Sequence, residues 1–344
     1  MRRTWPLVLV LAAASAASAQ TVERLADGIA VPVGERRLEL RVCREDIVRV
    51  AYAPKGAFFA RETMTIVKGA CLPTDFEVQT GDGSAAVTTR KLTARVALPS
   101  GAVTFLDRHG RTLLAEKTGG GKTMTAATVM GEQTSHVQAE FEPAAGEALY
   151  GLGAHQSGFM DYAGRDVDMY QLNTVDIVPF LASSRGYGLL WENTSHTKFG
   201  DLKPAVHVPA KNLVDAAGKP GGLTGTYRQG DCATGTVVGT RVDPQLALGA
   251  PEDRPPVIAA HQAPQALNAQ IHPKLKDGDV CVVWEGALET EAAGPYDIVP
   301  LATNGLRLWI DGKLAVDTYR QAWIPWYDQL RYTFGAKERH PIRV

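Results

Sequence analysis

The sequence predicts an all-β protein of two antiparallel β-sandwich domains that follow a signal peptide. Long helical patterns are nearly absent after the first 19 residues, and short alternating runs are separated by turn residues. Strands at this spacing are typical of antiparallel sandwiches, whereas the βαβ rhythm of a parallel barrel is missing. The chain has 344 residues, with 45% hydrophobic and 21% charged residues, a composition of folded globular protein rather than a disordered chain. This length corresponds to about two domains.

The N-terminus, MRRTWPLVLVLAAASAASAQ, has the three parts of a secretory signal peptide. Arg2 and Arg3 form the basic part, residues 6–14 are apolar, and Ala17-Ser18-Ala19 is a small-residue cleavage site. The apolar run is too short to span a bilayer. Residues 1–19 are therefore expected to be removed and the mature protein to be exported, periplasmic or secreted, with no membrane as partner. Cleavage takes the formal net charge from −1 to −3, a balance that does not favour nucleic acid as a partner.

The first domain is assigned to residues 20–213. In RRLELRVCREDIVRVAYAP, alternation places Leu38, Leu40 and Val42 on one face of a strand. The stretch AAVTTRKLTARVALPSGAVTFLDRHGRTLLAE alternates over several strands, with turns at PSG and DRHG. These strands predict the first sandwich.

The second domain is assigned to residues 214–344, because the regular pattern is lost near the turn-rich stretch Lys219-Pro220-Gly221-Gly222. New strands follow in LTGTYRQGDC, DVCVVWEGALE and LRLWIDGKLAVDTY. Asp311-Gly312 is a hairpin signal, since both residue types tolerate positive φ. Trp309 alternates within its strand and is expected to pack in the core.

Four cysteines, Cys43, Cys71, Cys232 and Cys281, allow three disulfide pairings. We favour Cys43–Cys71 and Cys232–Cys281, because each pair then lies within one proposed domain, and export permits disulfides. Four buried thiols are the alternative.

Several familiar patterns are incomplete. TGGGKT lacks the first glycine of a phosphate loop, and GLGAHQ lacks the last glycine of a dinucleotide fingerprint and any βαβ context. There is no C-x-x-C pair, no histidine pair at i, i+4 and no G-x-S-x-G elbow. We therefore predict no cofactor, no metal site and no catalytic residue in this chain.

Four stretches along residues 24–205 together resemble one known family. They are DIVRVAYAP, LTARVALPSGAVTFLDRHGRTLLAE, EALYGLGAHQSGF and PFLASSRGYGLLWENTSHTKFGD. In order and spacing they are similar to the N-terminal galactose-mutarotase-like β-sandwich of glycoside hydrolase family 31, which includes α-glucosidases and α-xylosidases. The stretch SSRGYGLLWEN resembles the α-xylosidase type.

This resemblance implies a sugar-binding segment before the strand that contains the Pro-Phe pair. In the family, the sandwich lends a loop to the sugar pocket of the neighbouring barrel, and an aspartate in that loop bonds sugar hydroxyls. Here Gln171-Leu172-Asn173-Thr174 occupies the matching stretch and Asn173 the place of the aspartate. The amide keeps an acceptor and adds a donor but loses the charge-assisted bond. Gln171, Asn173 and His155 are thus substrate-binding candidates, with a satisfied surface loop and a hydrogen-bonded structural histidine as the alternatives.

The second domain resembles the protective-antigen-type β-sandwich that is inserted in some carbohydrate-active enzymes. The stretches that carry this likeness are GGLTGTYRQGD, TRVDP, VVWEGAL and GLRLWIDGKLAVDTYRQAWIPW. Some adhesins of this fold bind sugar through calcium held by two consecutive aspartates, a pair that this sequence lacks. Trp323 and Trp326 flank Pro325 in an irregular segment and are candidates for stacking on sugar rings.

The resemblance also implies a catalytic domain that these two sandwiches do not provide. The family places two aspartates on a (β/α)₈ barrel, which takes about 250 residues. We expect this chain to be the N-terminal portion of an exported α-glycosidase whose barrel is not in residues 1–344 and whose substrate is an α-linked oligosaccharide such as a xylosylated glucan fragment. The alternative is a complete, non-catalytic carbohydrate-binding protein of two sandwiches; a protein-binding adhesion module is a third, weaker reading.

Overall fold

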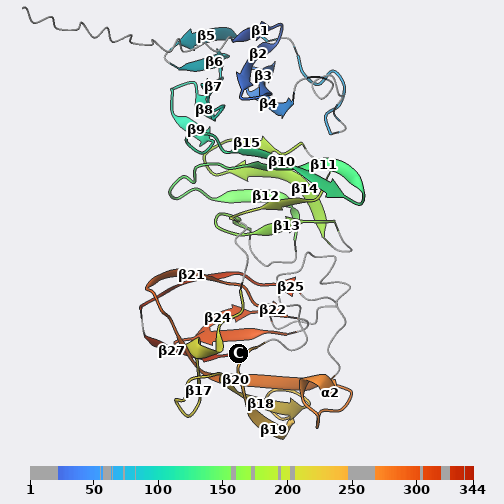
Figure 1. Ribbon diagram of the computed structural model, residues 1–344, viewed down its shortest axis with the longest axis vertical. Coiled ribbons are helices and arrows are strands. Elements are labelled where there is room, and N and C mark those ends of the chain that lie inside the picture. The colour runs from blue at the N-terminus through green and yellow to red at the C-terminus, as the bar shows by residue number, and fades with distance from the viewer. Residues whose placement is uncertain are drawn as a thin grey trace, which may run out of the picture. The chain divides into compact units, whose positions relative to one another are not determined.

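The computed structural model describes residues 22–54, 56, 63, 65–72, 74–81, 83–155, 160–171, 175–192, 195–201, 206–246, 268–302, 305–318, 326–336 and 338–344. Their regular structure is almost entirely antiparallel β (Figure 1), which confirms the predicted fold class. The expected signal peptide lies outside the described residues. Within these ranges, no helix has the length and apolar character needed to cross a membrane.

The chain divides into two compact units. One runs to Glu147 and also includes Ser183–Tyr187; the other comprises Ala148–Ala182 and Gly188–Val344. The boundary expected between residues 213 and 214 therefore falls inside the second unit. Ser183–Tyr187 belongs to the first unit because the Ser183 hydroxyl donates to Glu147 and the Arg185 guanidinium donates to the Thr112 carbonyl.

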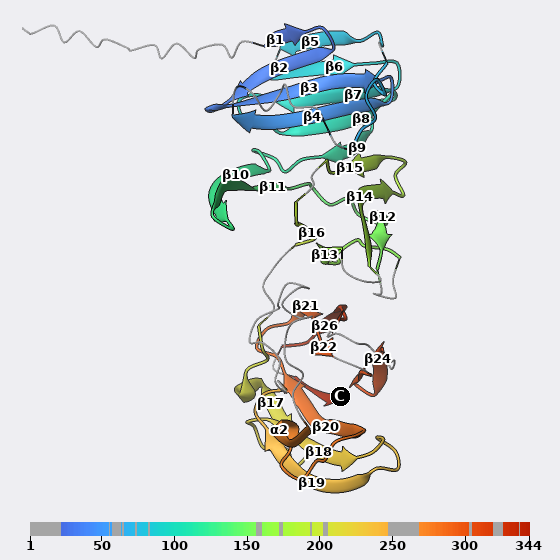
Figure 2. The same ribbon diagram turned by 90° about the vertical axis from the view of Figure 1, so that its right-hand side faces the viewer.

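The first unit is built on two antiparallel sheets that face each other (Figure 2). One sheet has four strands, namely β1 (Glu23–Leu25), β2 (Gly28–Val33), β3 (Arg36–Arg44) and β4 (Ile47–Pro54). The other has five strands, namely β5 (Glu77–Gly81), β6 (Ser84–Thr88), β7 (Leu92–Ala97), β8 (Val103–Asp107) and β9 (Thr112–Ala115).

Alternating apolar residues from both sheets fill the space between them. Leu38, Leu40 and Val42 of β3 meet Val87 and Val96 of the five-stranded sheet in one buried cluster, as the alternation predicts. Each fully buried side chain of this size contributes about 1.5–3 kcal/mol relative to an exposed one. This cluster is the core of the first unit.

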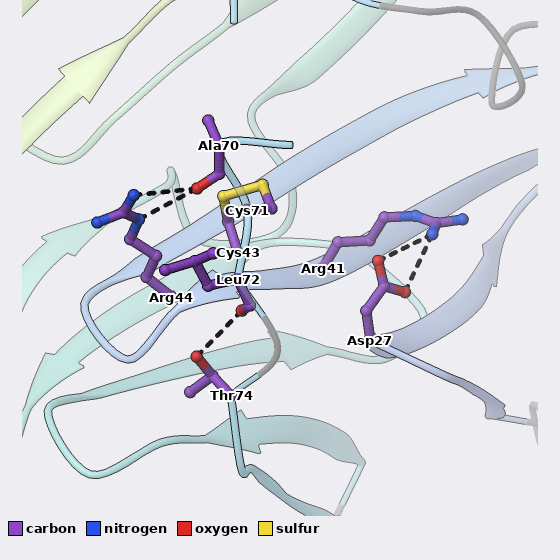
Figure 3. Close-up of a disulfide and its surroundings, with 8 residues drawn as sticks. All are labelled: Asp27, Arg41, Cys43, Arg44, Ala70, Cys71, Leu72 and Thr74. Atoms are coloured by element: carbon purple, nitrogen blue, oxygen red, sulfur yellow. Dashed lines mark hydrogen bonds and ion pairs between the residues drawn. A yellow bond between two sulfur atoms is a disulfide. The ribbon is translucent and has the colours of Figure 1, made fainter. Parts of the chain in front are cut away.

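A disulfide ties the chain after the four-stranded sheet back to β3 (Figure 3). Cys43 and Cys71 are bonded, with their Cα atoms 4.4 Å apart, and the Leu72 amide donates to the Cys43 carbonyl at 3.0 Å. The Arg44 guanidinium donates to the Ala70 carbonyl at 3.2 and 3.1 Å. These bonds hold residues 70–72 against the end of β3.

A two-stranded ribbon completes the first unit. Strands β10 (Lys122–Val129) and β11 (Glu132–Ala139) are joined by Met130 and Gly131, with φ of 51° and 85°. Two successive residues with positive φ match the right-handed twist of a tight hairpin.

The second unit begins with short strands around a small core. A three-stranded sheet has the order β12 (Leu149–Ala154), β14 (Asp176–Ser183), β15 (Gly188–Leu190), and β13 (Val167–Met169) pairs with β16 (Thr197–Phe199). Leu152, Leu181 and three side chains from the segment between their strands form the buried cluster; these three are Tyr162, Val167 and Met169.

The remainder of the second unit is organised by a seven-stranded antiparallel sheet. Its strands are β17 (Leu213–Asp215), β18 (Leu223–Gln229), β19 (Thr236–Asp243), β20 (Val280–Glu289), β23 (Arg307–Ile310), β24 (Lys313–Asp317) and β27 (Arg339–Arg343). Two further pairs join β21 (Gly294–Ile298) to β26 (Leu330–Phe334) and β22 (Leu301–Ala302) to β25 (Trp326–Tyr327). The described helices are a 3₁₀ turn at Ala210–Asn212 and α2 at Asn268–Ile271.

The β23–β24 hairpin has the predicted turn, but its tryptophan is not in the core. Asp311 and Gly312 join β23 to β24 with φ of 52° and 74°, which confirms the hairpin. Trp309, expected in the core, is half-buried, with the Arg343 guanidinium 5.4 Å from its ring centroid. Leu308 and Ile310 take the core positions of β23 instead.

A second disulfide and a buried carboxylate fasten the seven-stranded sheet. Cys232 is bonded to Cys281, so the two disulfides have the pairing favoured above. Asp243, 5% exposed, accepts hydrogen bonds from the Tyr227 hydroxyl at 2.5 Å, the Trp284 indole at 2.7 Å and Arg241 at 2.5 Å. Burial, and then the nearby carboxylate, raise the pKa of Tyr227, which keeps its hydroxyl a donor.

We expect Asp243→Ala to lower the free energy of unfolding by about 2–4 kcal/mol, because the Tyr227 hydroxyl and Trp284 indole lose their acceptor inside the protein. The matched control is Asp317→Ala, which removes an exposed ion pair to Arg307 in the same sheet and should cost at most about 1 kcal/mol. Urea unfolding measures both. Equal effects of the two variants would contradict a special role for Asp243.

Candidate functional site

A glycine-rich bend forms the end of β12 and determines where the next segment begins. Gly151, Leu152 and Gly153 have φ of 109°, 61° and 102° in succession. A Cβ atom on Gly151 would lie 2.4 Å from the Phe180 carbonyl oxygen, and one on Gly153 would lie 2.0 Å from that of Asp176. Only glycine permits this approach, so the end of β12 lies directly beside the start of β14.

His155 follows this bend and is used to stabilise it. Its Nε2 atom is 2.9 Å from the Leu152 carbonyl oxygen, and its ring meets the edge of the Tyr162 ring at a centroid distance of 5.8 Å. Leu152, in spite of its positive φ, is only 3% exposed. These contacts fit the interpretation of His155 as a hydrogen-bonded structural histidine, and its role in substrate binding stays a prediction.

Asp161 connects the following turn to the beginning of β12. The Leu149 and Ala163 amides each donate to Asp161 Oδ1 at 2.9 Å, and the Tyr162 amide donates to the Leu149 carbonyl at 2.7 Å. The hydrogen bonds from Ala163 and Leu149 lower the pKa of the Asp161 carboxyl. This aspartate is a structural anion rather than a free ligand.

Gln171 holds the start of β14. Its side-chain amide donates to Asp176 Oδ1 at 3.1 Å and accepts from the Ile177 amide at 3.2 Å. Since Gly153 lies against Asp176, the structure brings the surroundings of His155 and Gln171 to the same end of the β12–β14 pair. The surroundings of these two predicted site residues thus meet at one end of the strand pair, although the residues are 16 positions apart in the chain.

The other predicted site residues are described in part or not at all. Asn173 and Trp323 lie outside the described residues. Trp326 belongs to β25, where its backbone pairs with Ala302.

Sequence reasoning missed a carboxylate–imidazole pair in the same segment. Asp168 of β13 contacts His196, just before β16, through a hydrogen bond between its carboxylate and the ring Nε2. The Tyr170 ring meets the His196 ring edge-on at a centroid distance of 5.8 Å. The alternation of Asp166, Asp168 and Tyr170 in the sequence indicates a strand with one polar face, but it does not identify His196 as the partner of Asp168.

An apolar face lies on the same three-stranded sheet. It consists of four side chains, each 40–51% exposed: Tyr150 on β12, Val178 and Phe180 on β14, and Leu190 on β15. Phe180 and Leu190 are direct cross-strand partners, and the Phe180 ring lies over Gly188. Contiguous exposed apolar side chains of this kind often mark a surface that another domain or protein covers.

No group of three or more histidine, cysteine, aspartate or glutamate side chains that could hold a metal ion occurs in the part of the chain that the structure describes.

The comparison with protein families assigns this region. Residues 37–199 match the glycosyl hydrolase 31 N-terminal galactose mutarotase-like domain. This region is a family 31 N-terminal domain. The family 31 domain includes the bend, residues 155–171 that follow it (the polar segment) and the Asp168–His196 pair.

Individual proteins of the family are similar to parts of this chain. An α-xylosidase of Saccharolobus solfataricus is 42% identical over 71 residues, which are 18% of this chain and 10% of that protein. A family 31 glucosidase of Pseudescherichia vulneris is 47% identical over 53 residues, 15% of this chain and 10% of that protein.

A solved structure is similar over nearly the whole chain. The family 31 α-xylosidase of Xanthomonas citri superposes with a TM-score of 0.71 at 32% sequence identity and covers 94% of this chain. The similarity covers only 34% of the Xanthomonas enzyme. The chain thus spans about a third of this enzyme, and its matches span a tenth of each curated relative named above.

We expect Gly153→Ala to destabilise the second unit by about 2 kcal/mol more than Gly312→Ala. Both glycines have positive φ, so an alanine at either position carries a backbone cost of about 1–2 kcal/mol. A Cβ on Gly153 also collides with the Asp176 carbonyl, whereas one on Gly312 meets nothing within 4 Å. Urea unfolding compares the two variants; equal losses would show that the contact between β12 and β14 yields easily.

The Asp161 carboxylate should make the second unit less stable in acid. Its pKa is lowered below 3.8 in the folded protein, so its stabilisation is present above the unfolded value and is lost as the pH falls through the folded pKa. Asp161→Asn keeps an acceptor oxygen but removes this titration. At pH 7 the free energy of unfolding, measured with urea, should be larger for the wild type than for Asp161→Asn, and this difference should vanish as the pH falls below about 4. A difference that stays constant over this pH range would contradict a stabilising role of the ionised Asp161.

Proposed function

We propose that this chain is the N-terminal, β-rich portion of an exported family 31 α-glycosidase of the α-xylosidase type. Its substrate class is an α-linked oligosaccharide such as a xylosylated glucan fragment. The observation that carries the proposal is the similarity of 94% of the chain to a family 31 α-xylosidase at 32% identity, together with the family 31 domain at residues 37–199.

The proposal divides the chemistry between two regions. Retaining glycosidases need two carboxyl groups about 5–5.5 Å apart, one as nucleophile and one as acid and base. We assign these to a (β/α)₈ barrel outside residues 1–344, and sugar contacts to the segment that follows the bend at Gly151–Gly153. The support is that this segment is polar and leaves β12 and returns to β14 at the same end of a closely packed pair of strands, since binding loops are commonly carried by such scaffolds.

The apolar face of Tyr150, Val178, Phe180 and Leu190 supports a covering domain on the same sheet. Burial of exposed aromatic and branched side chains is the main driving force for such packing. This face is the one opposite to Ile177 and Leu181, against which Tyr162, Val167 and Met169 pack, so a covering domain would meet β14 on its other side.

The residues from 214 to 344 are assigned, within the proposal, to a protective-antigen-type sandwich that adds sugar contacts through Trp323 and Trp326. The support is that the similarity to the Xanthomonas α-xylosidase extends over 94% of the chain and so includes most of this region.

The test is the hydrolysis of an aryl α-xyloside by the protein expressed from its native gene and by purified residues 20–344. We expect turnover by the native product and none above background by residues 20–344, because the acid and the nucleophile lie elsewhere. In the native product, Asn173→Ala should weaken substrate binding by about 1–3 kcal/mol, since a buried sugar hydroxyl would lose its partner.

Two results would contradict the proposal. Turnover by residues 20–344 that is lost when one of their own carboxylates is replaced would place the catalytic groups in this chain. A native product that binds the sugar but does not hydrolyse any aryl α-glycoside would favour the non-catalytic carbohydrate-binding protein.

A further inference from the structure

The turn between β25 and β26 contacts the polar segment through one side chain. The Asp166 amide donates to Gln329 Oε1 at 2.8 Å, and Gln329 Nε2 donates to the Asp166 carbonyl. A glutamine amide offers one acceptor and one donor side at the spacing of a peptide group. Gln329 therefore pairs with both backbone groups of Asp166 as a neighbouring strand would.

The main chain of the same turn makes a second contact. The Arg165 guanidinium donates to the Gln329 carbonyl. Two successive residues of the segment, Arg165 and Asp166, are thus bonded to one residue that follows them by more than 160 positions.

Gly200, which directly follows β16, packs closely against the residues that make these bonds. A Cβ on Gly200 would lie 2.7 Å from the Arg165 carbonyl oxygen and 2.2 Å from Asp166 Oδ1. A Cβ on Gly164 would be in ordinary contact with Arg331 Nη1, at 3.4 Å. Arg331 is itself held by Asp297, its cross-strand partner, at 2.8 and 2.9 Å.

The segment needs an external support because its own secondary structure is short. Asp166 directly precedes β13, which has three residues and pairs only with the three residues of β16 among the strands described. An isolated pair of strands is marginally stable in water. Yet β13 carries Asp168, the partner of His196, and the segment continues to Gln171, which holds the start of β14.

We propose that Gln329 is a positioning residue that fixes residues 166–171 of the polar segment through its paired hydrogen bonds to Asp166. This inference rests on the proposed function in one respect only, namely that the segment presents sugar-binding groups. The region after residue 213 then contributes to the site by hydrogen bonds that hold the family 31 domain in place, and not only through sugar contacts of its own.

The experiment is hydrogen exchange, followed by mass spectrometry, on residues 20–344 and on variants of two glutamines. Gln329→Met keeps the length of the side chain and removes both hydrogen bonds. Gln229→Met is the matched control, because Gln229 makes the same kind of contact elsewhere in the unit: it accepts from the Lys276 amide at 2.8 Å and donates to the Lys276 and Asp279 carbonyls at 3.3 and 3.0 Å.

We expect the amides of residues 166–169 to exchange about tenfold faster in Gln329→Met, and those of residues 276–279 to be affected only in Gln229→Met. Gln329→Glu keeps the acceptor for the Asp166 amide and loses the donor, so its exchange should be intermediate. Unchanged exchange at residues 166–169 in Gln329→Met, or the same acceleration there in Gln229→Met, would overturn the proposal.

A second measurement separates this inference from the proposed function. In the native gene product, Gln329→Met should raise KM for a xylosylated oligosaccharide about fivefold or more, while Gln229→Met with a comparable loss in unfolding temperature should leave KM unchanged. If the wild type neither binds nor hydrolyses this sugar, the proposed function fails, whereas the exchange result alone still decides whether Gln329 positions the segment. An unchanged KM together with accelerated exchange would show that the contact is structural and overturn the positioning role.

Discussion

The close approach of β12 to β14 is the constraint on which the rest of the candidate site depends. At Gly151 and Gly153 the backbones are so near that a single added carbon would overlap a carbonyl oxygen. The positive φ values there turn Leu152 inward and direct its carbonyl to His155. The chain therefore leaves β12 in one defined direction, and the polar segment begins at a fixed place beside the start of β14.

Many polar side chains of that segment form hydrogen bonds that hold the segment itself in place. Asp161 binds backbone amides, Asp168 binds His196, and Gln171 binds the start of β14. From the sequence, each of these side chains is as good a sugar ligand as the others, because all offer oxygen acceptors. In the fold each of them also holds the segment in place, a role that the sequence alone did not distinguish from sugar binding.

Local patterns predicted the features that local physics determines. The alternation of Leu38, Leu40 and Val42 predicted their place in the core, and Asp311-Gly312 predicted a hairpin, because strand faces and positive φ depend on near neighbours. Contacts between residues far apart in the chain left no such pattern. Asp168 meets His196, Asp243 meets Trp284 and Asp166 meets Gln329 only because the topology brings their strands together. The wrong prediction for Trp309 has a different cause: the alternation of Leu308 and Ile310 on either side of it was the local signal of the core face, and it was assigned to the wrong residue.

The chemistry of the Gln329 contact distinguishes it from the charged pairs nearby. Arg331 and Asp297 are both about half exposed, so their attraction is screened by salt and contributes little to stability. The amide of Gln329 carries no charge and pairs with backbone groups that every residue possesses, so neither salt nor pH weakens its bonds. A brace of this kind fixes the path of the chain without dictating the side chain at position 166. The side chains of the polar segment can therefore change while the turn at Gln329 keeps the backbone of the segment in the same place. One scaffold can in this way present different hydrogen-bonding groups to different sugars.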